Sequence, residues 1–245
     1  MKTGSVYNRC CVLSRDAIKL FAMLTMTLNH AAHMFVPHGG LRDVLIYAGY
    51  FTAPVMCYFL VEGFDKTRDR RTYFLRLLAC AFLSQPFYDA ALDLGNLNML
   101  FTLSTCFLIL CVMERVRDGI FRSLAVLPLV LLTVFMDWPV VAAAFTVILY
   151  YGRRYGHVGI AYLGCYAFYA WYMGSPVMMG FGMRYGLVSG FGILAAGFCV
   201  AFLYSGRRMQ VSDKMRSFLQ AFFYVFYPAH LAGLILVRLI LNAAA

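Results

Sequence analysis

The sequence predicts an all-α fold, a polytopic membrane bundle of about nine transmembrane helices, and three observations indicate it. Of 245 residues, 62% are hydrophobic and only 13% are charged, and the mean hydropathy is +0.74. Soluble domains average about 45–50% apolar and about 25% charged residues. The apolar residues also form runs of membrane-spanning length that are separated by short polar breaks.

Nine of these runs are expected to cross the membrane. The sixth run is too short to cross the membrane perpendicularly. We therefore expect either that the residues after it extend the helix or that it lies in the bundle as a broken helix. The chain is expected to divide into a cytoplasmic segment at 1–15, one transmembrane domain at 16–241 and a short tail at 242–245. The predicted runs are 16–36, 42–63, 72–92, 98–115, 119–136, 138–151, 157–173, 185–204 and 217–240.

The distribution of cations predicts the orientation. With nine spans and the N-terminus inside, all but three of the 21 lysines and arginines fall in cytoplasmic segments, the exceptions being Arg42, Arg184 and Arg238. Cytoplasmic segments of membrane proteins carry such an excess. We therefore expect a multi-pass protein of the cytoplasmic (plasma) membrane with its C-terminus outside. The net charge of +10 then reflects topology and contact with membrane lipids, and no nucleic acid is expected as a partner.

The first run carries an ionisable side chain at membrane depth. Such a group costs at least about 2.5 kcal/mol to insert, so His30 is a functional-site hypothesis. Lys19 lies on nearly the same helical face, about 16 Å from His30 along the axis. Asn29 and His33 accompany His30. The alternative is that these side chains only form hydrogen bonds to a neighbouring helix.

Cations cluster after the second run, at its predicted cytoplasmic end. Glu62 precedes them and would orient an arginine rather than touch a ligand. Clustered guanidinium and ammonium groups suit a multiply phosphorylated ligand, although they also serve simply to anchor a span. The cluster contains Lys66, Arg68, Arg70, Arg71 and Arg76.

Amide and carboxyl side chains lie at the other ends of the third and fourth runs. Gln85 and Asp89 share a helix face at spacing i, i+4, and Asn98 opens the next run. Pro86 frees a backbone carbonyl, which is a common way to open a pocket between helices. These side chains fit either a pocket or hydrogen bonds between helices.

The last run repeats the pattern of the first. Tyr227 and His230 share a face, and His230 lies about as far from Arg216 as His30 lies from Arg15 along a helix. Two histidines at matched depth predict a shared site. The eight cysteines show no metal-ligand spacing, so no metal site is expected.

Four segments together resemble the TraX family, multispan proteins named for the conjugal pilin acetylase and similar to the wider membrane acyltransferase-3 group. They are KLFAMLTMTLNH at 19–30, the stretch 51–87, NMLFTL at 98–103 and FYVFYPAHL at 223–231. The resemblance implies an acetyl-CoA-dependent membrane N- or O-acetyltransferase. The donor would be cytoplasmic acetyl-CoA. The acceptor would be an amine or hydroxyl on the other side, such as a pilin-like peptide N-terminus, a cell-surface sugar or a small amine.

The resemblance also implies roles for individual residues. His30 would be the catalytic base, with Asn29, Tyr227 and His230 beside it. The family usually has aspartate where this chain has Asn29. The cofactor-binding residues would be Lys19, Glu62, Arg68, Arg70, Arg71 and Arg76, and the acceptor pocket would contain His33, Gln85, Asp89 and Asn98.

Two other functions remain open at this point. Asn29 in place of aspartate favours a catalytically degenerate TraX-like partner protein. A small transporter would also place histidines and amides inside a bundle. Transporters of that kind usually show an internal repeat or paired broken helices, and the sequence shows neither.

Overall fold

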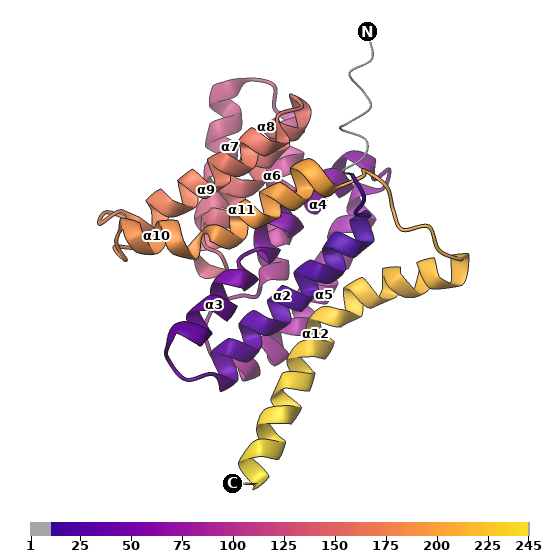
Figure 1. Cartoon of the computed structure of the whole chain (residues 1–245). Helices are drawn as coiled ribbons and strands as arrows, with labels where there is room; N and C mark the ends of the chain where they lie inside the picture. Colours follow the sequence, from indigo (N-terminus) through magenta and orange to yellow (C-terminus); the bar gives the residue numbers. More distant parts are fainter. Residues whose placement is uncertain (1–10, 245) are drawn as a thin grey trace.

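Helices follow one another without a β-strand throughout residues 11–244, the part of the chain that the computed structural model describes (Figure 1). The all-α prediction is confirmed. Residues 1–10 of the predicted N-terminal segment lie outside the described residues. The α-helices are α2 (Arg15–Phe35), α3 (Gly40–Gly49), α4 (Thr52–Lys66), α5 (Arg70–Leu92), α6 (Met99–Arg115), α7 (Gly119–Leu132), α8 (Val141–Arg154), α9 (Val158–Gly174), α10 (Met183–Ser189), α11 (Phe191–Phe198) and α12 (Asp213–Ala244).

Each predicted run corresponds to one helix or to a broken pair. The second run divides into α3 and α4. The fifth is α7 followed by a 3-10 turn at Thr133–Phe135, and the eighth is α10 and α11 followed by a π-helical turn at Cys199–Leu203. Helix α12 continues through the predicted tail as far as Ala244.

Side-chain caps explain where several helices begin. The Ser14 hydroxyl accepts a hydrogen bond from the Ala17 amide (3.2 Å) at the start of α2. Asp69 and Asn98 cap α5 and α6 in the same way. These caps satisfy amide groups that have no partner within the helix. They also fix where the polar ends of α2 and α5 lie, and these ends line the larger cavity described below.

The break between α3 and α4 is a place of very close packing. A Cβ added to Gly192 of α11 would lie 2.5 Å from the Tyr47 carbonyl oxygen and 2.8 Å from the Phe51 amide nitrogen. On the other side, the Asn29 side-chain amide donates to the Ile46 carbonyl at 2.9 Å. Small residues and polar side chains commonly join membrane helices in this way.

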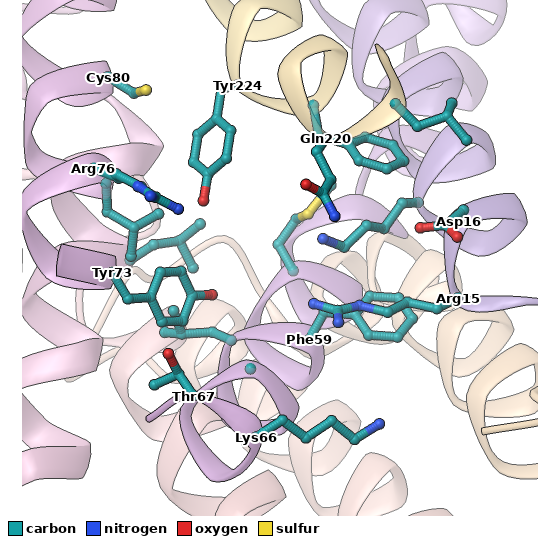
Figure 2. A pocket seen from close by; sticks show the side chains of 18 of the residues that line it. Arg15, Asp16, Phe59, Lys66, Thr67, Tyr73, Arg76, Cys80, Gln220 and Tyr224 are labelled. Carbon is teal, nitrogen blue, oxygen red and sulfur yellow. The ribbon is translucent and has the colours of Figure 1, made fainter. Parts of the chain in front are cut away.

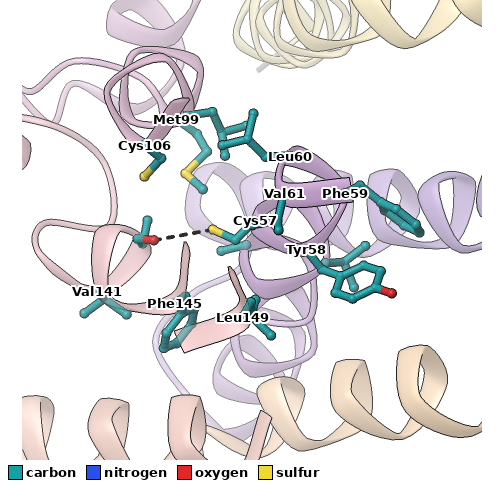
Figure 3. Close-up of a cluster of buried hydrophobic side chains, with 14 of the residues drawn as sticks. Cys57, Tyr58, Phe59, Leu60, Val61, Met99, Cys106, Val141, Phe145 and Leu149 are labelled. Carbon is teal, nitrogen blue, oxygen red and sulfur yellow. Dashed lines mark hydrogen bonds between the residues drawn. The ribbon is translucent and has the colours of Figure 1, made fainter. Parts of the chain in front are cut away.

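The core is centred on α4, which packs against α2, α6, α8 and α11. Val55, Cys57 and Phe59 of α4 are almost completely buried. Figure 3 shows Cys57 facing α8, where its thiol donates to the Ala142 carbonyl at 3.7 Å. Phe145 from α8 adds to this cluster. The rigid centre therefore lies beside the helices that carry the predicted site residues.

Three helical segments of the described chain are long and apolar enough to cross a membrane. They are Gly40–Lys66, Met183–Leu203 and Asp213–Ala244. Helices α6, α8 and α9 have 17, 14 and 17 residues. They are therefore shorter than the roughly 20 residues of a straight crossing. The three segments indicate a membrane protein, and α2, α5 and the shorter helices pack with them.

Candidate functional site

Two cavities lie in the bundle, and one residue lines both. The larger, of about 540 Å³, is formed mainly by α2, α4, α5, α12 and the segment 208–211. The smaller, of about 220 Å³, is formed mainly by α2, the α3–α4 junction, the turn at 137–139 and α9. Tyr227 of α12 lines the two cavities and therefore stands at their boundary.

The larger cavity is strongly cationic. Figure 2 shows Arg15 and Arg76 reaching into it from opposite sides. Two acidic residues, Asp16 and Asp69, also line it. A concave site with this excess of positive charge favours polyanions. Its cationic lining residues are Arg15, Lys19, Lys66, Arg76, Arg208 and Arg216.

Lys19 lies between two aromatic rings of this cavity. Its ammonium nitrogen is 5.7 Å from the centroid of Phe59 and 5.1 Å from that of Phe223. Aromatic faces attract a cation without neutralising its charge. No carboxylate of the described chain forms an ion pair with Lys19, so none competes with a ligand for its amino group.

Glu62 organises the cations from behind the cavity. Its side chain is only 2% exposed and does not line the cavity. One carboxylate oxygen accepts from the Lys66 ammonium at 2.8 Å, and the other lies 3.6 Å from Arg15 Nε. The Tyr204 hydroxyl donates to the same carboxylate at 2.9 Å. The expectation that Glu62 would orient an arginine agrees with this geometry.

Replacing Glu62 by glutamine should destabilise the protein by about 2 kcal/mol. This is below the roughly 3–5 kcal/mol seen when a fully buried ion pair loses one partner, because the Lys66 side chain is 50% exposed. The measurement is thermal unfolding in detergent. The matched control is Glu114→Gln, which removes an ion pair between half-exposed side chains and should cost less than about 1 kcal/mol. Equal effects of the two substitutions would contradict the assigned role of Glu62.

Three of the predicted cofactor-binding arginines do not line the larger cavity. Arg70 forms an ion pair with Glu114, and its guanidinium lies 4.1 Å from the Phe64 ring centroid. Arg68 and Arg71 are exposed. These three arginines therefore lie outside the larger cavity, whereas Lys19 and Arg76 of the predicted cofactor-binding residues line it.

The two histidines predicted to share a site are in contact. His30 Nδ1 and His230 Nε2 are 2.9 Å apart, and His230 Nδ1 lies 2.9 Å from the Phe226 carbonyl oxygen. A carbonyl can only accept, so His230 Nδ1 carries its proton and His230 Nε2 accepts from His30 Nδ1. His30 Nε2 then retains its lone pair. This arrangement leaves His30 able to take a proton, with its tautomer fixed by the neighbouring groups.

His30 is 7% exposed and lines the smaller cavity. His33 and Asn29 line the same cavity, but the Asn29 amide is used by the Ile46 carbonyl. Asn29 therefore joins α2 to α3 by this hydrogen bond, while its side chain lines the cavity beside His30. The Phe226 carbonyl and His230 orient His30 instead.

Tyr227 has an unused donor at the boundary of the cavities. Its hydroxyl is buried and makes no hydrogen bond within the described residues. A buried polar group without a partner is costly in a folded protein. A ligand or a reacting oxygen in either cavity would supply the missing partner.

Three of the four residues predicted for the acceptor pocket, Gln85, Asp89 and Asn98, lie elsewhere. Asn98 donates to the Gln85 side-chain oxygen at 2.8 Å and to the Ala81 carbonyl at 2.9 Å. Gln85 donates to Asp89 at 2.6 Å. None of these three predicted residues lines either cavity; they join α5 to the start of α6.

Sequence reasoning missed Gln220 and Tyr224 as lining residues, although their spacing from Arg216 and Tyr227 could have revealed them. Arg216, Gln220, Tyr224 and Tyr227 follow one another at spacings of four, four and three, which place them on one face of α12. All four line the larger cavity. Asp137, in the turn between α7 and α8, also lines the smaller cavity, and burial raises its pKa to about 6.

Comparisons with known proteins agree with this architecture. The family model described as TraX protein matches residues 14–238. The chain is also similar to a Dichelobacter nodosus protein named "Probable fimbrial assembly protein FimC, serogroup H1". The two are 32% identical over 161 residues, which is 60% of this chain and 66% of the relative, so the chain spans just under two thirds of that protein's length. No solved structure matches the chain. Because the family match extends from α2 into α12, the chain belongs to the TraX protein family.

Proposed function

We propose that this protein is a membrane-embedded acetyltransferase. It moves an acetyl group from cytoplasmic acetyl-CoA to an amine or hydroxyl at the extracytoplasmic side. In this proposal the chain crosses the membrane about nine times with its N-terminus inside, and it is related to the acyltransferase-3 group. All the cations that line the larger cavity belong to segments that the positive-inside rule places in the cytoplasm.

The larger cavity is the proposed donor site. Phosphate groups of CoA bind to its cations, since guanidinium and ammonium groups form strong charge-assisted hydrogen bonds with phosphate. Lys19 and Arg76 approach from α2 and α5, and Arg216 approaches from α12. The thioester end of the donor extends along α12 toward Tyr227.

The smaller cavity is the proposed acceptor site. His30 Nε2 accepts the acceptor's proton as its nitrogen or oxygen attacks the thioester carbonyl. The Tyr227 hydroxyl donates to the oxygen that becomes negatively charged. The C–S bond then breaks, CoA leaves as a thiolate, and the proton on His30 neutralises it. The main support for this proposal is the position of Tyr227, which lines both the larger, cationic cavity and the smaller cavity that contains His30. Its hydroxyl has no hydrogen-bond partner among the described residues.

The acceptor we propose is a peptide amine. The similar protein from Dichelobacter nodosus is named as a fimbrial assembly protein, which favours the N-terminus of a pilin-like subunit over a sugar or a small amine.

The proposal is tested with purified protein in lipid nanodiscs. We expect release of CoA thiol from acetyl-CoA, faster when a pilin-like peptide with a free N-terminus is added. Acetyl-pantetheine, which carries the thioester without the nucleotide phosphates, is the matched donor and should require a much higher concentration. If the protein neither bound nor turned over acetyl-CoA, with an amine acceptor or with a hydroxyl acceptor, the proposal would be refuted and a structural partner protein would be favoured.

A further inference from the structure

Asp137 is a carboxylate in the acceptor cavity that has no ion pair in the described part of the chain. Its Oδ1 accepts from the Trp138 amide at 3.0 Å. Its other carboxylate oxygen makes no hydrogen bond with any described residue. Asp137 is partly exposed to this cavity. A charge without a partner among aromatic and aliphatic side chains is unfavourable, so this carboxylate is prepared for a cation or a proton.

Aromatic rings surround the same space. Trp138 and Tyr50 meet edge to face with ring centroids 5.2 Å apart, and Tyr169 lies 6.0 Å from Trp138 and 5.9 Å from Tyr50. All three residues line the cavity with Asp137. Aromatic walls around one carboxylate are the chemistry that recognises an organic ammonium group.

The turn that carries Asp137 is held in a strained conformation. Trp138 and Val140 have φ angles of +56° and +62°, a region that is sparsely populated by non-glycine residues and is worst for β-branched ones. Hydrogen bonds hold the turn in place. The Thr102 hydroxyl donates to the Asp137 carbonyl at 2.7 Å, and the Val140 amide donates to the Thr133 hydroxyl at 2.9 Å. Such strain persists where the surrounding structure fixes it, and it places Asp137 and Trp138 in the cavity.

We propose that Asp137 binds the ammonium form of the acceptor and takes the first of its two departing protons. This inference rests on the proposed acetyltransferase function. An ammonium group cannot attack a thioester because it has no lone pair. Transfer of one proton to Asp137 produces the neutral amine. The amine forms the N–C bond as the C–S bond breaks, and its second proton goes to His30 and then to the CoA thiolate. The proton on Asp137 returns to solvent.

The proton affinity of the carboxylate suits this role. Burial raises the pKa of Asp137 to about 6, so it is ionised at pH 7 and becomes protonated as the pH falls through about 6. Ammonium binding should weaken over that range. The other titratable side chains that line the cavity are His30, His33, Tyr50, Tyr88, Tyr169 and Tyr227.

Trp138 supplies a binding assay that needs no turnover. The chain has two tryptophans, and Trp171 does not line the cavity, so Trp171→Phe leaves Trp138 as the only indole. In this background we expect butylammonium to change the Trp138 emission with saturation, and Asp137→Asn to weaken its binding at least 10-fold. 1-Butanol, the neutral control, should bind alike in both. Unchanged butylammonium binding by Asp137→Asn would overturn the proposal.

The same titration at pH 5 and pH 7.5, without substitution of Asp137, keeps the proposal testable if Asp137→Asn fails to fold. Weaker binding at pH 5 supports it, and equal binding overturns it.

With acetyl-CoA, Asp137→Asn should lower transfer to a peptide amine at least 10-fold and spare transfer to a hydroxyl acceptor. Equal loss with both acceptors would overturn the specific role. Absence of transfer in the unaltered protein would instead refute the acetyltransferase function, which the fluorescence assay does not require.

Discussion

Replacing His30 by alanine is expected to lower the rate of acetyl transfer about 1,000-fold at saturating donor. General base catalysis by a positioned side chain contributes about 10²- to 10⁴-fold. His30 lines the acceptor cavity, whereas the cations proposed to bind CoA line the other one. The affinity for acetyl-CoA should therefore change little. Separate measurement of kcat and of the KM for acetyl-CoA distinguishes the two quantities.

His38 provides the matched control for this experiment. It lies in an exposed loop beside Arg42 and lines neither cavity, so His38→Ala should retain full activity. His230→Phe should lower the rate less than His30→Ala. It removes the hydrogen-bond acceptor of His30 Nδ1 but leaves the base in place. If folded His30→Ala and His30→Gln proteins kept full transfer, His30 would not be the base.

Hydropathy predicted the helices well but not their interruptions. The predicted runs reproduce the helical stretches from α2 to α12 because long apolar runs are a strong local signal. The division of the second run into α3 and α4 has a non-local cause. Gly192, far along the chain, approaches the backbone of Tyr47 and Phe51 so closely that no side chain fits there. No window of local sequence contains that contact.

The histidine pair was predictable because depth in a helix can be counted from its charged end. That count placed His30 and His230 at the same level, and the 2.9 Å contact between them confirms it. Which group would orient His30 was not predictable. Sequence adjacency favoured Asn29, but consecutive residues in a helix point in directions about 100° apart, and Asn29 faces α3.

Composition predicted a cationic site but not which cations form it. Their closeness in the sequence groups the cations after Glu62 into one cluster, although their side chains point in different directions around the start of α5. Glu114 of α6 engages Arg70, whereas Arg76 reaches the cavity. Arg216 joins the site from far along the chain because α12 packs against α5, and Arg208 joins it because the Met209 amide donates to Asp16 at the start of α2. Tertiary packing therefore determines which cations line the larger cavity.

Reversing the charge of Arg76 should raise the KM for acetyl-CoA about 10- to 100-fold while kcat changes little. A charge-assisted hydrogen bond contributes about 1.5–3 kcal/mol, and each 1.4 kcal/mol is a factor of ten in affinity. The matched control is Arg71→Glu on the same helix, which alters the net charge equally at an exposed position outside the cavity. It should change the KM less than about 3-fold, and raising the salt concentration should weaken donor binding by the unaltered protein more than by Arg76→Glu. Equal effects of both substitutions would show that these arginines act only through the overall charge of this membrane surface. A selective effect of Arg76→Glu would locate the phosphates between α2, α5 and α12, and only a donor bound there has Tyr227 between its thioester end and His30.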